Sequence, residues 1–154
     1  MELVYRKATL RDIPAMQALV QPEIESGIIL VRSDNEIATN IRSYTLAFDG
    51  EKLVGFAALH IHTPDLAETR SLIVREGYRS RHVGTTLVQR ALDEAAALGI
   101  KEVLALTYRR EFFEKLGFYE IPKESLPEHK IWADCIKCKH FPVCNEIALI
   151  KTVS

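Results

Sequence analysis

One segment in the middle of the chain, residues 74–87 with the apolar run that enters it at 72–74, constrains the fold more than any other. An apolar, largely β-branched run enters a short polar loop, which opens into a helix whose apolar residues recur at helical spacing. A loop at this strand-to-helix junction directs several unpaired backbone N–H groups, and the positive end of the helix dipole, toward one point. Arg79 and Arg81 add positive charge there. The segment predicts an anion site, most naturally for phosphate groups, although an ordinary turn with solvated arginines would carry the same residues.

The size and composition of the chain indicate one soluble domain, 1–154. Its 154 residues are enough to bury a core, and 47% apolar with 27% charged residues is ordinary for a globular protein. The net charge of −1 argues against nucleic acid or an anionic membrane as a partner. Neither a secretory signal nor an apolar stretch near the roughly 20 residues that span a bilayer is evident. We expect a cytoplasmic protein.

Helix caps and apolar periodicity predict the elements of the N-terminal half. Thr9 is a good helix N-cap, and Ser33 with Glu36 three residues later forms a capping box. The connection 21–32 shows no clear period and is expected to be partly exposed. The elements expected are a strand at 3–7, a helix at 10–20 and a helix that runs from 34 to about 43.

Turn signals and β-branched runs predict the elements of the C-terminal half. Asp49-Gly50 indicates a hairpin, and Gly99 indicates a helix end. The elements expected are strands at 44–48, 53–61, 67–74, 102–107, 118–121 and 147–152, helices at 84–98 and 111–116, and a long loop at 122–146. This order implies an α/β fold of mixed α+β character, in which a central mixed sheet carries helices on both faces.

The order of elements, with the anion loop between the fourth strand and the third helix, resembles the GNAT superfamily of N-acetyltransferases. The family's loop pattern, Arg/Gln-x-x-Gly-x-Gly/Ala, matches at Arg79 and Gly84. It departs at His82, where a histidine Cβ would crowd a backbone that approaches pyrophosphate closely. The family's second signature matches at Phe112–Phe118. The resemblance implies a mostly antiparallel central sheet and acetyl-CoA as co-substrate.

A closer resemblance is to the acetyltransferase domain of N-acetylglutamate synthases, particularly their short, single-domain bacterial forms. It implies transfer of acetyl to the α-amine of L-glutamate, the first step of arginine biosynthesis, by an enzyme that is a homodimer at the family level. The amino-acid-kinase-like domain of the long synthases is missing from this sequence, so we expect no arginine feedback through it. The matching residues are Leu30–Ser33, Ala105–Tyr108, Phe112–Phe118, and His129–Cys135 with Cys138 and Cys144.

The resemblance assigns the cofactor to the fourth strand and the anion loop. The strand backbone would pair with the pantetheine arm and supply an oxyanion donor, and the loop N–H groups would bind pyrophosphate. The cofactor residues expected are Leu72, Ile73, Val74, Arg79, Ser80, Arg81, His82, Val83, Gly84 and Thr85.

The resemblance also implies the groups that handle protons. Glu68 lies at the family's position for a strand carboxylate and is the expected general base, unless it is a solvent-facing strand residue. Many relatives use a tyrosine as general acid where this chain has Phe113, so Tyr108 or Thr107 is the expected replacement, with packing as the alternative for Tyr108. His60 and His62 flank the same hairpin.

Glutamate carries two carboxylates, and its pocket needs fixed cations. Arg32, in the family's Val-Arg-Ser context, is the expected carboxylate ligand, since arginine binds carboxylates bidentately. Lys130 is a second expected ligand. On residue type alone, each is equally a solvated surface charge.

Three cysteines lie in the predicted loop, at metal-ligand spacing. Cys135, Cys138 and Cys144, with His140 or His129, match a tetrahedral Cys3His structural zinc site. A single C-x-x-C is a weak zinc signal, and packing as small apolar groups or a reversible disulfide are alternatives.

Two other functions stay open from the sequence. One is a GNAT enzyme that acetylates another amine, such as glutamine, a polyamine or a protein N-terminus. The other is a non-catalytic acetyl-CoA-binding module, which the departures at His82 and Phe113 favour.

Overall fold

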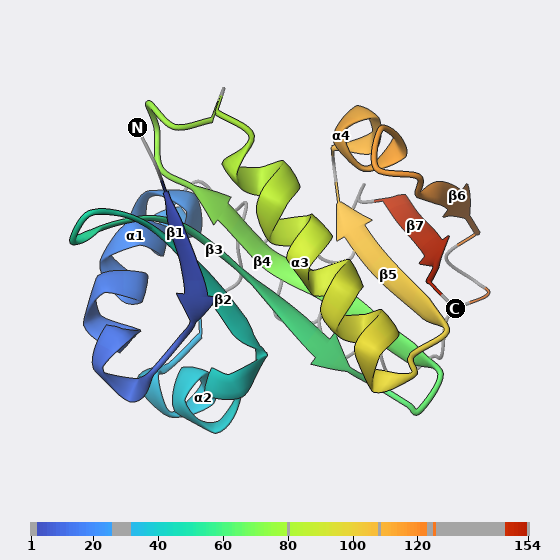
Figure 1. Cartoon of the computed structure of the whole chain (residues 1–154), viewed down its shortest axis with the longest axis horizontal. Coiled ribbons are helices and arrows are strands. Elements are labelled where there is room, and N and C mark those ends of the chain that lie inside the picture. Colours follow the sequence, from blue (N-terminus) through green and yellow to red (C-terminus); the bar gives the residue numbers. More distant parts are fainter. Residues whose placement is uncertain are drawn as a thin grey trace.

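The structure, a computed structural model, describes residues 3–25, 32–79, 81–107, 109–122, 125 and 147–153. Within them, seven strands form one sheet in the order β1-β2-β3-β4-β5-β7-β6 (Figure 1). The strands are β1 (Val4–Lys7), β2 (Tyr44–Asp49), β3 (Lys52–Ile61), β4 (Leu66–Val74), β5 (Glu102–Thr107), β6 (Tyr119–Ile121) and β7 (Ile147–Thr152). The helices are α1 (Ile13–Glu25), α2 (Asp34–Thr39), α3 (Val83–Leu98) and α4 (Arg110–Glu114), with short 3-10 helices at Leu10–Asp12 and Ile41–Ser43.

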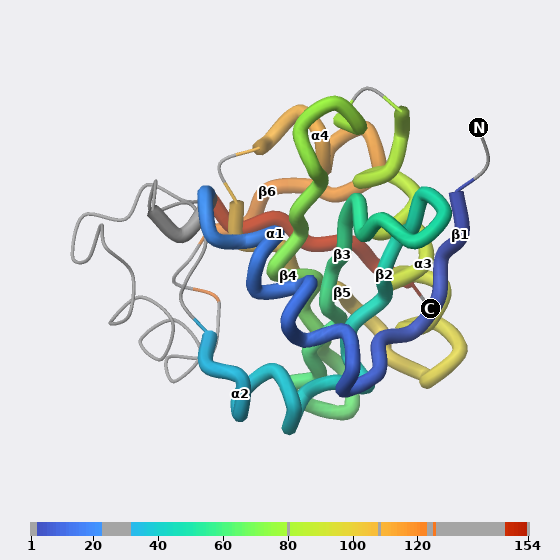
Figure 2. The backbone as a smooth tube through the Cα atoms, turned by 90° about the vertical axis from the view of Figure 1, so that its left-hand side faces the viewer, coloured from blue at the N-terminus to red at the C-terminus, as the bar shows by residue number. Residues whose placement is uncertain are grey.

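The sheet is mixed and mostly antiparallel, as expected. β4 and β5 run parallel, whereas the other neighbouring strands of the described sheet run antiparallel. A parallel pair needs a crossover, and α3 supplies it. The α1–α2 side and the α3 side cover opposite faces of the sheet (Figure 2). The predicted α/β fold with helices on both faces is confirmed.

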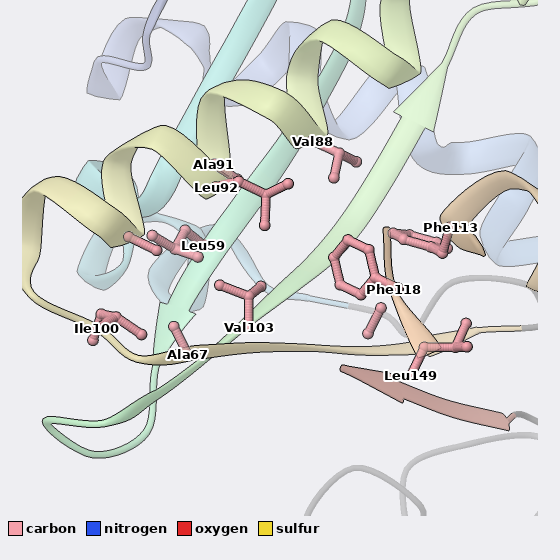
Figure 3. Packing of buried hydrophobic residues seen from close by; sticks show 12 residues of the cluster. Leu59, Ala67, Val88, Ala91, Leu92, Ile100, Val103, Phe113, Phe118 and Leu149 are labelled. Carbon is pink, nitrogen blue, oxygen red and sulfur yellow. The ribbon is translucent and has the colours of Figure 1, made fainter. Parts of the chain in front are cut away.

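The core on the α3 face is built from the apolar stripe that the helix sequence predicts. Val88, Ala91 and Leu92 of α3 pack against Leu59, Val103 and other strand residues (Figure 3). Phe113 of α4 completes this cluster, with Phe118 at a ring-centroid distance of 5.1 Å. Burial of these side chains fixes α3, and therefore the loop before it, against the sheet.

The opposite face has its own core under α1 and α2. Met16 and Leu19 of α1 and Ile37 of α2 pack on β2, β3 and β4. Tyr44 is part of this buried cluster, and its ring meets that of Phe56 edge to face at 5.7 Å. The α1–α2 face is therefore the face into which Tyr44 projects.

The prediction for residues 21–32 is wrong over its first part. α1 continues to Glu25 and contains Pro22, whereas the sequence predicted a helix end at residue 20. Pro22 has no N–H for the i→i−4 hydrogen bond of the last turn, and the packing of the N-terminal part of α1 on the sheet holds the helix despite this loss. The second helix is shorter than predicted, because α2 ends at Thr39 and a 3-10 helix follows.

The capping predictions are confirmed. The Ser33 hydroxyl accepts from the Glu36 N–H at 3.1 Å, and the Glu36 carboxylate accepts from the Ser33 N–H at 3.2 Å. The Asp12 carboxylate accepts from the Thr9 N–H at 2.7 Å. Gly99 ends α3 with φ at 87°. These local hydrogen bonds position the first residues of both N-terminal helices.

Strands β4 and β5 separate part-way along their length. Their pairing runs from Leu66 with Glu102 to Glu68 with Leu104, and β4 continues to Val74 (Figure 1). β4 also carries a bulge, since Ser71 and Leu72 lie opposite the single residue Ala57 of β3. Ser71 has a φ of 58°, the left-handed conformation found at such bulges. Beyond Glu68, the backbone edge of β4 that faces β5 is therefore not paired with β5.

Candidate functional site

Glu68 lies where β4 and β5 separate, and it is a buried carboxylate. Its exposure is 3%, which excludes the solvent-facing alternative. Its Oε1 lies 3.0 Å from Nε2 of His62 and 4.0 Å from Nη1 of Arg70. The His60 ring meets the His62 ring edge to face at 4.6 Å. Glu68 is therefore a buried carboxylate in contact with basic side chains.

Arg70 was not among the residues that the sequence analysis selected. It follows Glu68 by two positions, and β-strand alternation puts both on the same face. The register sets Tyr44, Ala58 and Arg70 side by side across β2, β3 and β4. The spacing of two residues from Glu68 could have placed Arg70 on the same face of the strand. The sequence could not show which residues of the neighbouring strands lie beside Arg70.

Two arginines from distant segments lie near the Tyr44 hydroxyl. Burial raises the pKa of Tyr44, and the positive charges of Arg32 and Arg70, with a hydrogen bond to the Ser71 side chain, act in the opposite direction. Arg32 precedes α2, where the capping box of Ser33 holds the chain. The fold therefore brings Arg32 and the Glu68–Arg70 strand segment to one side of the sheet.

Arg32 is held from both its backbone and its side chain. Its carbonyl accepts from Nε2 of Gln17 at 2.9 Å, and its Nη1 lies 3.8 Å from Oε2 of Glu36. Its side chain is largely buried, so it is not a fully solvated charge. A positioned guanidinium of this kind can bind a carboxylate through two parallel hydrogen bonds.

The predicted loop lies between β4 and α3, as expected, with residue 80 outside the described residues. α3 begins at Val83, and Arg79 donates from Nε to the Val74 carbonyl at 3.1 Å. Arg81 stacks on the Tyr78 ring, 5.1 Å from its centroid. His82 has a φ of 60°, so this histidine adopts the left-handed conformation that glycine prefers. His82 therefore adopts the backbone conformation that a glycine would adopt here, and the left-handed conformation is less favourable for a histidine.

A second arginine, Arg109, lies beside this loop and was also missed. Its guanidinium stacks on the Phe112 ring, 4.5 Å from the centroid. The Phe112 ring borders the first turn of α3, since a Cβ on Gly84 would lie 3.4 Å from it. Burial, and the neighbouring positive charge of Arg79, lower the pKa of Arg109. Two arginines from the loops after β4 and β5 thus converge beside the N-terminus of α3.

The remaining predicted residues divide into two groups. Phe113 is a buried core residue, and Thr107 accepts a hydrogen bond on Oγ1 from the Arg109 N–H at 2.9 Å at the end of β5. Thr85 lies in the first turn of α3 and Leu72–Val74 in β4. Outside the described residues lie Ser80, Tyr108, His129, Lys130, Cys135, Cys138, His140 and Cys144.

The zinc prediction is not tested by the structure. The part of the chain that the structure describes contains no group of three or more His, Cys, Asp or Glu side chains able to hold a metal ion. The three cysteines lie beyond that part. Within the described residues, no helix is both long and apolar enough to cross a membrane.

A mixed sheet that divides between two parallel strands, beside a strand-to-helix anion loop, is the arrangement of an acetyl-CoA-dependent N-acetyltransferase. Residues 12–118 match the model of the acetyltransferase (GNAT) family. The chain belongs to this family and is a GNAT N-acetyltransferase.

Sequence relatives agree with this assignment. An uncharacterized N-acetyltransferase of Chlorobaculum tepidum is 37% identical over 148 residues, which cover 96% of this chain and 95% of that protein. The amino-acid acetyltransferase of Mannheimia succiniciproducens is 32% identical over 127 residues, or 81% of this chain. The chain matches 29% of the length of that longer protein.

Among solved structures, this chain is similar to the N-acetylglutamate synthase of Neisseria gonorrhoeae complexed with coenzyme A and N-acetyl-glutamate. The TM-score is 0.88 at 26% identity. The match covers 100% of this chain and 36% of that chain. That protein binds coenzyme A and an N-acetylated amino acid in its structure.

Proposed function

We propose that this protein acetylates the α-amine of L-glutamate with acetyl-CoA, as an N-acetylglutamate synthase. One observation carries the proposal: a buried carboxylate, Glu68, lies on the same side of the sheet as two arginines, Arg32 and Arg70. A dicarboxylic amino acid needs a base for its ammonium and cations for its carboxylates. The similarity to amino-acid acetyltransferases supports the same substrate class.

In the proposed reaction, Glu68 accepts a proton from the glutamate ammonium, directly or through one water. The free amine then forms a C–N bond to the thioester carbon, the C–S bond breaks, and coenzyme A leaves as a thiolate; the nitrogen loses its second proton, which balances the proton that the thiolate takes up. A backbone N–H of β4 beyond Glu68, where pairing with β5 has ended, is the proposed oxyanion donor. Thr107 or Tyr108 stays the predicted proton source for the thiolate.

The proposed cofactor site is the loop 79–85 with its two flanking arginines. Arg79 comes from the predicted motif, and Arg109 joins it from the loop after β5. Guanidinium groups beside a helix N-terminus favour a pyrophosphate over a neutral ligand. Lys130 as a second substrate ligand, structural zinc, a homodimer, a cytoplasmic location and a place in arginine biosynthesis stay predictions.

Thiol release from acetyl-CoA against glutamate, glutamine, aspartate and spermidine tests the proposal. We expect turnover with glutamate, and a loss of about 100-fold or more in kcat for Glu68→Gln with coenzyme A binding unchanged. Glu51→Gln is the matched control, since Glu51 is exposed in the β2–β3 turn. Turnover with spermidine alone would overturn the proposal, and selective turnover with glutamine would reassign the acceptor.

A further inference from the structure

The bulge of β4 contains a serine in the left-handed conformation. Ser71 and Leu72 lie opposite the single residue Ala57 of β3, and Ser71 has a φ of 58°. This conformation is unfavourable for a residue that has a Cβ, whereas glycine adopts it readily. Contacts of the folded protein must therefore hold Ser71 in this conformation.

The bulge reverses the alternation of side chains along β4. Before it, Arg70 pairs with Ala58, which belongs to the core under α1 and α2. After it, Ile73 belongs to that same core, although regular alternation would place a residue three positions from Arg70 on the opposite face. Backbone N–H groups alternate between the two edges of a strand with the same period. The bulge therefore also sets which N–H groups face the edge of β4 that is not paired with β5.

Tyr44 contacts the bulge from β2, two strands away. It pairs with Ala58 of β3, which pairs in turn with Arg70, the residue before Ser71. Tyr44 is 5% exposed, and its ring packs edge to face on Phe56. Its hydroxyl is hydrogen-bonded to the Ser71 side chain. The core thus fixes the ring of Tyr44, and the hydroxyl at its end contacts the left-handed residue of the bulge.

We propose that Tyr44 is a positioning residue for acetyl transfer, because its hydroxyl holds Ser71 in the conformation that sets the backbone of β4 beyond the bulge. That backbone is the proposed partner of the pantetheine arm and the proposed oxyanion donor. The inference therefore rests on the acetyl-CoA part of the proposed function and is independent of which amine is the acceptor. In this role Tyr44 acts through Ser71 and need not touch substrate or cofactor.

The same hydroxyl lies near Arg32 and Arg70, so a second role for it is to orient these arginines. Substitutions at Ser71 separate the two roles. Ser71→Ala removes the hydrogen bond to the bulge and leaves the Tyr44 hydroxyl beside the arginines. Ser71→Gly allows a φ near 58° without any hydrogen bond, but it cannot replace a contact between a phenol and an arginine. Rescue by glycine is therefore specific to the role at the bulge.

The test measures thiol release from acetyl-CoA with the most active amine among glutamate, glutamine, aspartate and spermidine. Tyr44→Phe and Ser71→Ala each remove the hydrogen bond, and each should lower kcat by about 10-fold. Ser71→Gly should lower kcat by less than about 2-fold, and the double variant Tyr44→Phe/Ser71→Gly should lie within about 2-fold of it. Tyr119→Phe is the control, since Tyr119 is an exposed tyrosine of β6.

A loss of kcat in Tyr44→Phe that Ser71→Gly does not restore overturns the inference and assigns the hydroxyl to the arginines. Wild-type kcat in Tyr44→Phe or in Ser71→Ala also overturns it. The amine that is used judges the proposed acceptor separately: turnover with spermidine alone overturns glutamate as the substrate and leaves this inference intact. If no amine releases thiol, isothermal titration with coenzyme A decides. A Kd that Tyr44→Phe raises and Ser71→Gly restores supports the inference, and any other result overturns it.

Discussion

His62 Nε2 lies 3.0 Å from Glu68 Oε1, and this contact joins the residue that follows β3 to the first part of β4. Both side chains are almost completely buried. A buried carboxylate without a hydrogen-bond partner is costly, so the imidazole stabilises Glu68 in one orientation. His62 is therefore a positioning residue for the proposed base.

Replacing His62 tests this role. We expect His62→Phe to lower kcat by about 10- to 100-fold, because an aromatic ring is retained but Glu68 loses the contact with the imidazole Nε2. KM for acetyl-CoA should not change. His62→Gln, which keeps a nitrogen donor, should recover much of the activity. Wild-type kcat in His62→Phe would show that the contact has no catalytic consequence.

Arg109 should contribute to cofactor affinity. Its stacked guanidinium lies beside the first turn of α3, near Arg79. Arg109→Gln is expected to raise Kd for coenzyme A by about 10-fold at low ionic strength, and by less at high salt, because salt screens the charge. Isothermal titration measures both. Arg110→Gln is the control, since Arg110 pairs with Glu120; equal effects of the two changes would contradict the assignment.

The backbone conformation of His82 is less favourable for histidine than it would be for glycine. Its φ of 60° disfavours residues with a Cβ by about 1 kcal/mol. His82→Gly should raise the free energy of unfolding by about 0.5 kcal/mol, since the greater freedom of glycine in the unfolded chain offsets part of the gain. Urea denaturation measures it. His82→Ala keeps the Cβ and should not stabilise; an equal gain in both variants would exclude backbone strain as the cause.

Asp12 gives the fold an acid-sensitive contact. The Arg6 guanidinium, at 2.9 Å, and the Thr9 N–H lower the pKa of Asp12 from 3.8 to about 2. A lowered folded-state pKa stabilises the protein above pH 3.8, and the stabilisation is lost as the pH falls toward 2.

The matching variant is Asp12→Asn. At pH 7 it should lower the free energy of unfolding by roughly 1 kcal/mol, a value reduced because Arg6 is partly exposed. Urea denaturation at pH 7, 4 and 2 should show the difference between wild type and variant shrinking at the lowest pH. A difference that does not depend on pH would assign the effect to helix capping alone.

Much of the fold follows from short-range patterns. The capping box at Ser33, the hairpin turn at Asp49-Gly50 and the end of α3 at Gly99 each depend on hydrogen bonds or backbone conformations within a few residues. The same holds for the anion loop before α3. The helix end at residue 20 was predicted wrongly, because packing on the sheet, rather than local preference, carries α1 through Pro22.

The sequence by itself determined the class of this protein. The order of its elements, the loop before α3 and the family signatures each depend on the spacing of residues within short segments. The tertiary structure decided how the site is composed. Tyr44 and Arg32 meet the Glu68–Arg70 segment of β4 because β2, β3 and β4 pair in one register with α2 packed on them, and Arg109 meets Arg79 because Phe112 of α4 packs beside α3. Strand register and helix packing join residues that are 24 to 38 positions apart, a range over which no local pattern carries information.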